Sequence, residues 1–451
     1  MVQPPERPAS HLFYQSRLRR PLIDRAEGIH IWDVHGRRYI DGSSGAMVCN
    51  IGHSNPRVLQ AMRQQMEKAT FAYRLHFENE PAEELARETA RLMPGDLERV
   101  FFVSGGSEAV ESTLKLARQY ALATGQAQRH KVISRFPSYH GGTLGALAVT
   151  GYEPLTKPFA AMMADMPKVP APTCYLDRDN LSMDERGVKY ADMLAEEIER
   201  QGPDSVLAFI MEPIGGASTG ALVAPDSYYA RVAEICRHYG ILLIFDEVMT
   251  GAGRTGTFLA AEHWNIVPDI IALSKGFASG YVPLGAMVAR SAIVEPVLSA
   301  GGFLHGFTYA GNPLACAAGR AVLKEVVERD LTGNAERTGG YLMDRLRSLQ
   351  ERYPFIGDVR GKGLLIAFEM VADRETMKVL PPELNAYQRV VDLAYERGLI
   401  VYSRRTRGGR EGDHVMVCPP LIVEHTDVDD IIAILDDALS VFAREAGLPQ
   451  H

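Results

Sequence analysis

The sequence predicts an α/β fold, in which a mostly parallel sheet lies between layers of helices and a smaller α+β domain accompanies it. Through the middle of the chain, short apolar runs alternate with amphipathic stretches, a pattern typical of strands joined by helical crossovers. After about residue 330, long polar helices flank shorter strands. The chain has 451 residues, 46% of them hydrophobic, and is too long for one simple core.

The first part of the chain, residues 1–60, is expected to be an N-terminal segment that belongs to the smaller domain. Alternating runs within residues 28–42 flank a polar turn, which predicts a β-hairpin. Residues 61–330 are expected to form the large domain, with amphipathic helices such as 109–121 between its strands. The predicted strands span residues 100–103, 131–134, 206–211, 241–245, 270–273 and 286–289.

The last part of the chain, residues 331–451, is predicted to form the smaller domain. Its helices are expected at 337–352, at 383–397 and from an N-cap at Thr426, and its strands at 363–370, 399–402 and 414–417. The last helix places six apolar residues on one face, namely Ile431, Ile432, Leu435, Ala438, Leu439 and Phe442. Residues 404–413 are rich in arginine and glycine, which predicts a long polar loop.

Composition argues against several classes of partner. A net charge of −8 disfavours nucleic acid and anionic membranes. The five cysteines are scattered and lack metal-ligand spacing, so we expect a reducing compartment and no metal site. No stretch reaches the roughly 18 apolar residues of a transmembrane helix, and the first residues lack a signal pattern. We therefore expect a cytoplasmic protein.

Charged side chains stand at the ends of three of the predicted strands. Lys275 is one of them, and burial at such a place lowers the pKa of an ammonium and frees the amine to react with an aldehyde. Asp246 and Glu212 follow two other strands. Because the ends of parallel strands meet at one edge of a sheet, where ligands bind, we expect the three groups to converge.

The loop Ser104-Gly105-Gly106-Ser107 lies between a predicted strand and the helix at 109–121. Its glycines let the backbone approach an anion closely, and the helix N-terminus offers free N–H groups. No lysine follows the glycines, so the loop is not a nucleotide-binding P-loop. We interpret it as a phosphate cradle.

The loop Tyr139-His140-Gly141 follows a further strand, and a tyrosine ring placed there can lie against a flat heteroaromatic ligand. Five strand ends thus supply a phosphate cradle, an aromatic plate, two carboxylates and a lysine. That set describes a pyridoxal phosphate site. The lysine binds the aldehyde, and Asp246 keeps the pyridine nitrogen protonated so that the ring accepts electrons.

A second glycine pattern, G-x-G-x-x-G at residues 251–256, suggests a dinucleotide site. Such a site needs the glycines at the strand-to-helix turn and a second strand that ends in an acid about 20 residues later. Five residues separate the pattern from the preceding strand, and no such second strand follows. The sequence therefore disfavours a nicotinamide-dependent oxidoreductase.

The sequence resembles the class III, or omega-type, aminotransferases, a branch of the fold-type-I pyridoxal phosphate enzymes. The resemblance extends from about residue 10 to the C-terminus and implies the fold of that branch. It rests on six motifs in family order, at residues 102–109, 138–141, 211–213, 245–256, 273–276 and 306–313.

The resemblance implies a role for each candidate residue. Lys275 would bind the cofactor covalently and Asp246 would pair with the pyridine nitrogen. Val248 and Tyr139 would cover the two faces of the ring. Thr308 would reach the phosphate of the partner subunit's cofactor, because the family forms homodimers, or dimers of dimers, with shared active sites. The other cofactor-binding candidates are Ser104, Gly105, Gly106, Ser107, His140, Gly141, Glu212 and Met249.

Three residues are candidates for substrate binding: Met47, Tyr73 and Arg404. Met47 stands where many family members that use pyruvate have tryptophan, so its smaller, flexible side chain should change the pocket. Arg404 and Arg405 both lie near the place of the family's mobile carboxylate-binding arginine, and the sequence leaves the choice open. The phosphate loop also lacks the family's usual Asn-Ser-Gly-Ser.

The resemblance implies a transaminase that moves an amino group from an amine or ω-amino acid to a 2-oxo acid such as pyruvate, by a ping-pong reaction through pyridoxamine phosphate. An aminomutase or epimerase on the same scaffold is the main alternative. A binding or regulatory protein without turnover is a third reading, which the complete set of Lys275, Asp246 and Glu212 disfavours.

Overall fold

The computed structural model describes residues 10–451. The first residues, on which the expected lack of a signal pattern rests, lie outside that range. Within it, no helix is long and apolar enough to cross a membrane. The domain boundaries at residues 60 and 330 stay predictions.

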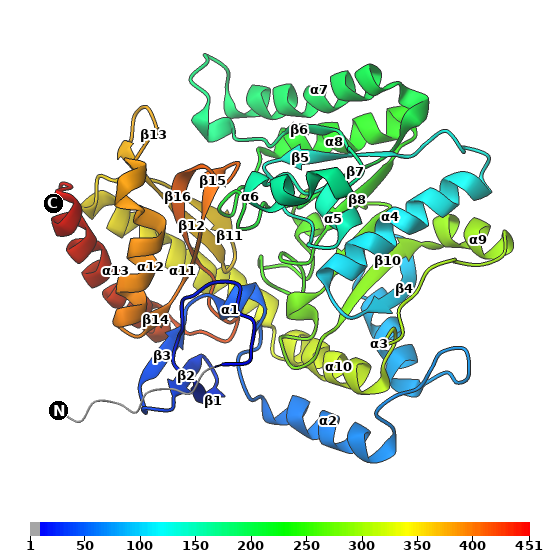
Figure 1. Cartoon of the computed structure of the whole chain (residues 1–451), viewed down its shortest axis with the longest axis horizontal. Coiled ribbons are helices and arrows are strands. Elements are labelled where there is room, and N and C mark those ends of the chain that lie inside the picture. The colour runs from blue at the N-terminus through cyan, green and yellow to red at the C-terminus, as the bar shows by residue number, and fades with distance from the viewer. Residues whose placement is uncertain (1–9) are drawn as a thin grey trace.

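A seven-stranded sheet forms the centre of the larger part of the molecule (Figure 1). Its strands, in spatial order, are β4 (Leu97–Val103), β10 (Gly285–Arg290), β9 (Ile270–Leu273), β8 (Leu242–Asp246), β7 (Val206–Met211), β5 (Lys131–Phe136) and β6 (Lys168–Pro170). β10 pairs antiparallel with both of its neighbours, and the other pairs are parallel. The α/β class and all six predicted strands of this sheet are confirmed, and β6 is an addition.

Both faces of this sheet are buried. Side chains of β8 alternate between two apolar clusters, with Leu243 and Phe245 in one and Ile244 in the other. α4 (Gly106–Ala123) and α9 (Ser291–Ser299) contribute to the cluster of Ile244. The opposite cluster includes residues of α2 (Pro56–Lys68), α3 (Glu80–Ala90), α7 (Met183–Gln201), α8 (Asp226–Tyr239) and α10 (Pro313–Glu328). Burial on both faces explains why these strands read as continuous apolar runs.

A smaller antiparallel sheet follows in the order β11 (Ile356–Lys362), β12 (Leu365–Asp373), β16 (Glu411–Val417) and β15 (Tyr402–Arg407), with β13 (Lys378–Val379) on β12. Figure 1 shows it beside α11 (Leu331–Arg352), α12 (Ala386–Glu396) and α13 (His425–Ala446). The N-terminal strands β1 (Ile23–Glu27), β2 (His30–Asp33) and β3 (Arg38–Asp41) contain the predicted hairpin. β3 pairs in parallel with β14 (Leu399–Ile400), so the two ends of the chain share a sheet.

Two predictions in the last part of the chain are wrong. Residues 404–413 are not a loop, because they belong to the antiparallel hairpin of β15 and β16. The last helix begins one residue after Glu424, and Thr426 lies inside it rather than at the N-cap. Asp427 caps from within the helix, since its carboxylate accepts a hydrogen bond from the Glu424 N–H at 2.9 Å. The six apolar residues predicted for this helix are all buried.

Candidate active site

A cavity of about 430 Å³ lies at the edge of the large sheet where β5, β7, β8 and β9 end. It brings together most of the residues predicted for the site: Met47, Gly106, Ser107, Tyr139, His140, Gly141, Glu212, Asp246, Val248, Met249, Lys275 and Arg404. The convergence follows from parallel strand order, as expected. One detail differs, because β10 lies between β4 and β9, so the five strand ends are not neighbours in space.

Lys275 directly follows Ser274 at the end of β9 and has a left-handed backbone, with φ of +45°. A side chain other than glycine seldom adopts this conformation, and such strain is typical of functional positions. Burial lowers the pKa of the Lys275 ammonium, while the charges of Asp246 and Glu212 act in the opposite direction. The lowered pKa increases the fraction of neutral amine, the form that attacks an aldehyde.

Asp246 ends β8 and is almost completely buried. One carboxylate oxygen accepts a hydrogen bond from the Val248 N–H at 3.1 Å, and the other lies 2.8 Å from Nδ1 of His140. The His140 backbone N–H is itself held by Thr150. Nε2 of His140 is buried and has no hydrogen-bond partner among the described residues. The pairing of His140 with Asp246 was not predicted, because it joins residues 106 positions apart.

Glu212 follows β7 and is buried. Its carboxylate accepts hydrogen bonds from the N–H groups of Gly216 at 3.1 Å and Tyr139 at 3.4 Å, and the Arg135 guanidinium lies 3.9 Å away. Burial raises the pKa of Glu212, and Asp246 adds to the effect. Glu212 thereby orders the loop that carries the Tyr139 ring into the cavity.

The phosphate loop opens α4 with Gly105 as its N-cap and with no side-chain cap. The first N–H groups of this helix are therefore available to an anion. Gly106 also packs closely against a neighbouring loop. A Cβ built on Gly106 comes 2.8 Å from Cγ1 of Val248, so the two residues are in close contact. On Gly105 the corresponding Cβ meets nothing within 4 Å, which leaves open space beside the start of the helix.

The "Aminotransferase class-III" family model matches residues 14–439. The chain belongs to this family. An uncharacterized aminotransferase of Bacillus subtilis is 40% identical over 427 residues, which cover 94% of this chain and 96% of the relative. A leucine/methionine racemase of Thermococcus litoralis is 35% identical, with 92% and 90% covered.

Two solved structures share the fold over nearly the whole chain. One is an (S)-enantioselective omega-transaminase from Thermomicrobium roseum, with a TM-score of 0.90, 37% identity and 96% of each chain covered. The other is an omega transaminase from Pseudomonas jessenii in complex with PMP, with a TM-score of 0.89, 32% identity and 95% and 94% covered. The fold-type-I architecture is thus confirmed for this class III aminotransferase.

Class III aminotransferases use pyridoxal phosphate, and the cavity of this aminotransferase fits that cofactor. The open space at the uncapped start of α4 suits a phosphate, and the buried carboxylate of Asp246 suits a protonated ring nitrogen. The lowered pKa of Lys275 suits attack on an aldehyde. Val248 and Tyr139 both line the cavity, as does His140 with its unpartnered nitrogen.

Four candidates of this aminotransferase lie outside the cavity lining: Ser104, Gly105, Tyr73 and Thr308. Ser104 and Gly105 immediately precede the lining residues Gly106 and Ser107. The Tyr73 ring packs edge-on against His76, with centroids 5.2 Å apart. The roles of Tyr73 and Thr308 stay predictions.

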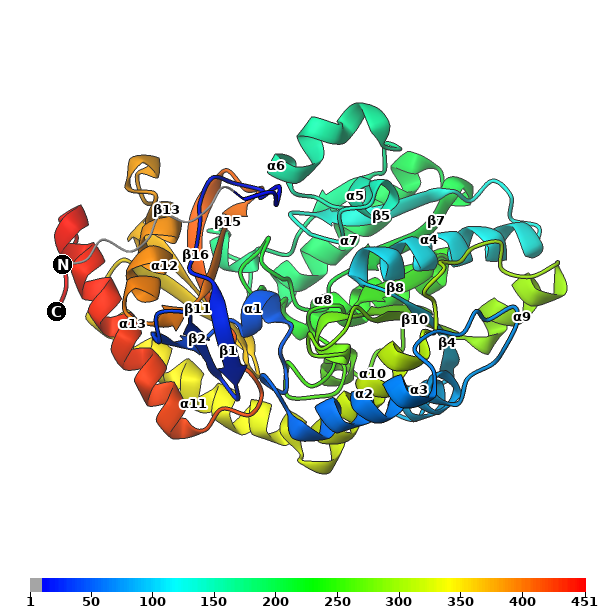
Figure 2. The ribbon, with the colours of Figure 1, turned by 60° about the horizontal axis from the view of Figure 1, so that its bottom comes forward.

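The two candidate arginines have different surroundings. Arg404 lines the cavity, and its guanidinium lies over the Tyr402 ring at 4.9 Å. Arg405 points to the other face of β15, where its Nε donates to Asp413 at 2.9 Å. Tyr402 was missed, although strand alternation places it on the same face as Arg404. Gln15 also lines the cavity, and no sequence signal indicated it. It belongs to the segment before β1, which extends toward α6 (Glu153–Thr156) in Figure 2.

The G-x-G-x-x-G pattern forms turns rather than a dinucleotide cradle. Gly253 and Gly256 have φ of +93° and +97°, and no regular α-helix begins in this loop. This geometry disfavours a nicotinamide site, as the sequence did. Between the glycines, Arg254 is completely buried.

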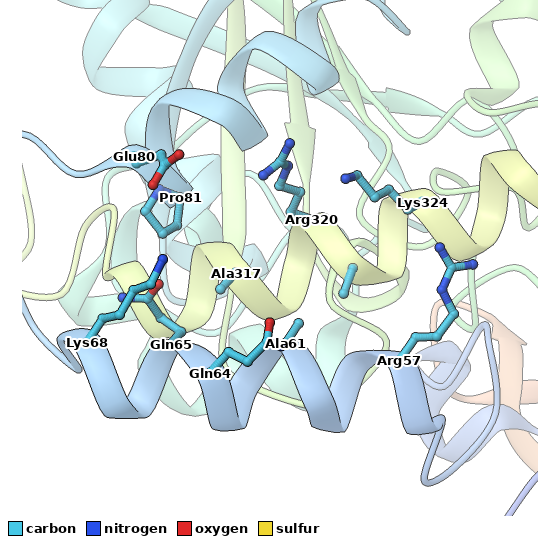
Figure 3. A pocket seen from close by; sticks show the side chains of 11 residues that line it. Arg57, Ala61, Gln64, Gln65, Lys68, Glu80, Pro81, Ala317, Arg320 and Lys324 are labelled. Carbon is cyan, nitrogen blue, oxygen red and sulfur yellow. The ribbon is translucent and has the colours of Figure 1, made fainter.

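A second hollow, of about 350 Å³, lies between α2 and α10 (Figure 3). Both of its arginines already have acidic partners: Arg57 lies 2.6 Å from Glu325, and Arg320 lies 3.0 Å from Glu84 and also pairs with Glu88. None of the predicted site residues lines it. The predicted site residues thus converge on the first cavity and not on this hollow.

Proposed function

We propose that this aminotransferase moves an amino group from an amine or ω-amino acid to a 2-oxo acid such as pyruvate, by a ping-pong reaction through pyridoxamine phosphate. Arg404 is the observation that carries the proposal. Among the described residues that line the cavity, it is the one cation besides Lys275. A guanidinium binds a carboxylate through two parallel hydrogen bonds, which suits the oxo acid.

The surroundings of Arg404 support a substrate that changes charge between the half-reactions. No carboxylate of the described residues pairs with Arg404, whose contacts are the Tyr402 ring and the Ser403 carbonyl oxygen at 3.4 Å. Apolar side chains line much of the remaining cavity: Ala46, Met47, Leu155, Ala217, Val248 and Met249. An uncharged amine is expected to pack against these side chains while Arg404 stays over the tyrosine ring.

The chain's own residues divide the work of the reaction. When bound, pyridoxal phosphate supplies a ring that accepts electrons from the substrate carbon. Asp246, oriented by His140, would stabilise a positive charge on the ring nitrogen. Lys275 would hold the cofactor through Nζ and would move a proton to and from the substrate carbon.

We propose that the enzyme works as a homodimer with a shared site. Several apolar side chains near the predicted Thr308 contact are strongly exposed in the single chain, including Leu304 at 85%, Leu75 at 73% and Phe77 at 73%. The Phe71 and Tyr309 rings pack edge to face at 6.0 Å and join the two segments that carry these residues. An exposed apolar patch of this kind suits a subunit contact.

A half-reaction screen tests the proposal. The purified holoenzyme is mixed with a panel of amines and ω-amino acids, and the absorbance of the bound cofactor is followed. We expect at least one amine to convert the cofactor to its amino form with release of an oxo product, and pyruvate to reverse the conversion. No conversion by any amine or ω-amino acid contradicts the proposal.

Epimerase activity is the second candidate, because one relative is a leucine/methionine racemase. The same screen separates the two functions when the amino-acid products are analysed on a chiral column. Inversion of an amino acid without release of an oxo product favours the epimerase.

A further inference from the structure

The wall of the cavity formed by residues 44–47 has an unusual backbone. Ser44, Gly45 and Met47 have φ of +49°, +66° and +55°. Two of these three residues carry side chains that disfavour the left-handed region. Ala46 and Met47 line the cavity, and Met47 is 2% exposed. A segment with so much strain holds one shape only when its surroundings impose it.

Arg254, from the G-x-G-x-x-G loop, supplies much of that restraint. One guanidinium nitrogen donates to Oγ of Ser44 at 3.0 Å and to Oδ1 of Asn50 at 2.7 Å. The other donates to the carbonyl oxygens of Leu364 and Pro419. The guanidinium thus joins the two sides of the strained segment to the start of β12 and the end of β16.

The partners of Arg254 extend the connection toward Lys275. Nδ2 of Asn50 donates to the Ala252 carbonyl oxygen at 2.9 Å, which closes the link back to the arginine's own loop. A Cβ built on Gly276 comes 2.2 Å from Nδ2 of Asn50, so Asn50 packs directly on the backbone beside Lys275. The same residues therefore contact both the substrate wall and the lysine loop.

The chemistry of Arg254 is unusual for a buried cation. It is 0% exposed, and among the described residues no carboxylate forms an ion pair or hydrogen bond with it. Burial lowers its pKa to about 10, so it keeps its charge at neutral pH. An unpaired buried charge is costly, and an apolar side chain in this place would avoid that cost. An apolar side chain has no hydrogen-bond donors at this place. Lysine also lacks the branched guanidinium, whose N–H groups let Arg254 donate in several fixed directions.

We propose that Arg254 is a positioning residue that fixes the strained 44–47 wall and thereby sets which amines the cavity accepts. The inference rests on the proposed function, because it concerns the amine substrate of the same cavity. Arg254 itself does not line the cavity and acts through Ser44, Asn50 and Met47.

The test uses the holoenzyme of the wild type and Arg254→Lys, with Arg129→Lys as a matched control. Arg129 also donates to backbone carbonyl oxygens, those of Pro203, Val206 and Tyr239, and does not line the cavity. The first measurement is hydrogen exchange at residues 43–50. We expect Arg254→Lys to speed exchange there at least about tenfold, since one hydrogen bond to a charged group is worth about that factor. The control variant should leave exchange in this segment unchanged.

The second measurement is the ratio of kcat/KM for a small amine to that for a bulky amine. Any loss common to both amines cancels in this ratio, including a general effect on Lys275 or on folding. We expect Arg254→Lys to change the ratio at least about tenfold, the scale on which an apolar pocket discriminates small differences in size. Met47→Ala should change the ratio as well, and the two changes should not add, since Arg254 acts through the wall.

Several results overturn the proposal. The proposal fails if Arg254→Lys leaves hydrogen exchange at residues 43–50 unchanged, or if exchange rises uniformly across the chain. It also fails if exchange at 43–50 becomes faster while the ratio of kcat/KM for the two amines stays the same. If Arg254→Lys does not fold, Ser44→Ala removes one arm of the contact and is read by the same two measurements. If the wild type accepts no amine, the proposed function fails, whereas the exchange data still show whether Arg254 restrains the segment.

Discussion

Replacement of Arg404 by alanine is the sharpest test of how one pocket accepts two kinds of substrate. The proposed oxo-acid substrate would bring a carboxylate into the cavity, and Arg404 is the one cation besides Lys275 among the described residues that line it. An apolar amine brings no such group. We therefore expect Arg404→Ala to impair the half-reaction with pyruvate and to spare the half-reaction with an apolar amine.

The size of the effect follows from the surroundings of Arg404. Loss of one partner of a buried hydrogen-bonded charge pair costs about 2–5 kcal/mol. The lower end applies here, because the free Arg404 side chain is exposed and water screens it. Each 1.4 kcal/mol is a factor of ten, so kcat/KM for pyruvate should fall by at least about 30-fold.

Single-turnover kinetics of the two half-reactions measure this effect separately. Arg405→Ala is the matched control, since Arg405 is adjacent in sequence but pairs with Asp413 on the other face of β15. We expect the control to keep a pyruvate rate close to that of the wild type, because Arg405 does not line the cavity and its guanidinium faces Asp413 instead. Equal losses in both half-reactions of Arg404→Ala, or no loss in either, would refute the reasoning.

Four further predictions concern the cofactor site and stability. Lys275→Ala should abolish turnover while circular dichroism stays native, and full multiple-turnover activity would contradict the assignment. Asp246→Asn should keep the cofactor but lower kcat at least about 100-fold, the scale of removing one electrostatic partner. Gly106→Val should push Val248 aside and weaken cofactor retention on dialysis. Burial lowers the pKa of His414 to about 3. Between that value and the ordinary pKa of about 6.5, His414 binds a proton only in the unfolded chain. The free energy of unfolding should therefore fall by about 2 kcal/mol from pH 7 to pH 5. In denaturant titrations, His414→Leu should reduce the fall of the unfolding free energy between pH 7 and pH 5. An unchanged fall would exclude His414 as its cause.

The sequence predicted well those parts of the fold that have a signal within one short stretch of residues. The strands at 206–211 and 270–273 have the predicted bounds, since each is a continuous apolar run that is buried on both faces. Lys275 and Asp246 were found because each stands at the end of such a run. The α4 start was found through its glycines, and the structure adds a close contact of Gly106 with Val248.

The missed features depend on pairs of residues that are distant in the sequence. Arg254 makes its contacts with side chains and carbonyl groups more than 100 positions away, so a local pattern of glycines shows nothing of its role. The pairing of His140 with Asp246 has the same cause. β15 was predicted to be a loop because its sequence shows no alternation of apolar and polar residues. It is an edge strand whose buried positions are the polar residues Ser403 and Thr406.

The hairpin changes how Arg404 is expected to serve both half-reactions. The resemblance implied a mobile carboxylate-binding arginine, and residues 404–413 were predicted to form a loop, yet Arg404 pairs with His414 in the β15–β16 ladder. The end of the hairpin is also held, because Tyr152 donates to the Arg405 carbonyl oxygen at 3.1 Å and Arg410 Nε donates to Glu153 at 2.6 Å.

With the backbone fixed in this way, the motion is confined to the side chain of Arg404. Its long, flexible stem lets the guanidinium rotate between the Tyr402 ring and a carboxylate in the cavity. The ring then has a function of its own, since a cation over an aromatic face keeps part of its stabilisation when no carboxylate is bound. The proposed recognition of two kinds of substrate therefore requires two alternative partners for one guanidinium. The strand β15 supplies the first of them, because it carries Tyr402 two residues from Arg404 on the same face.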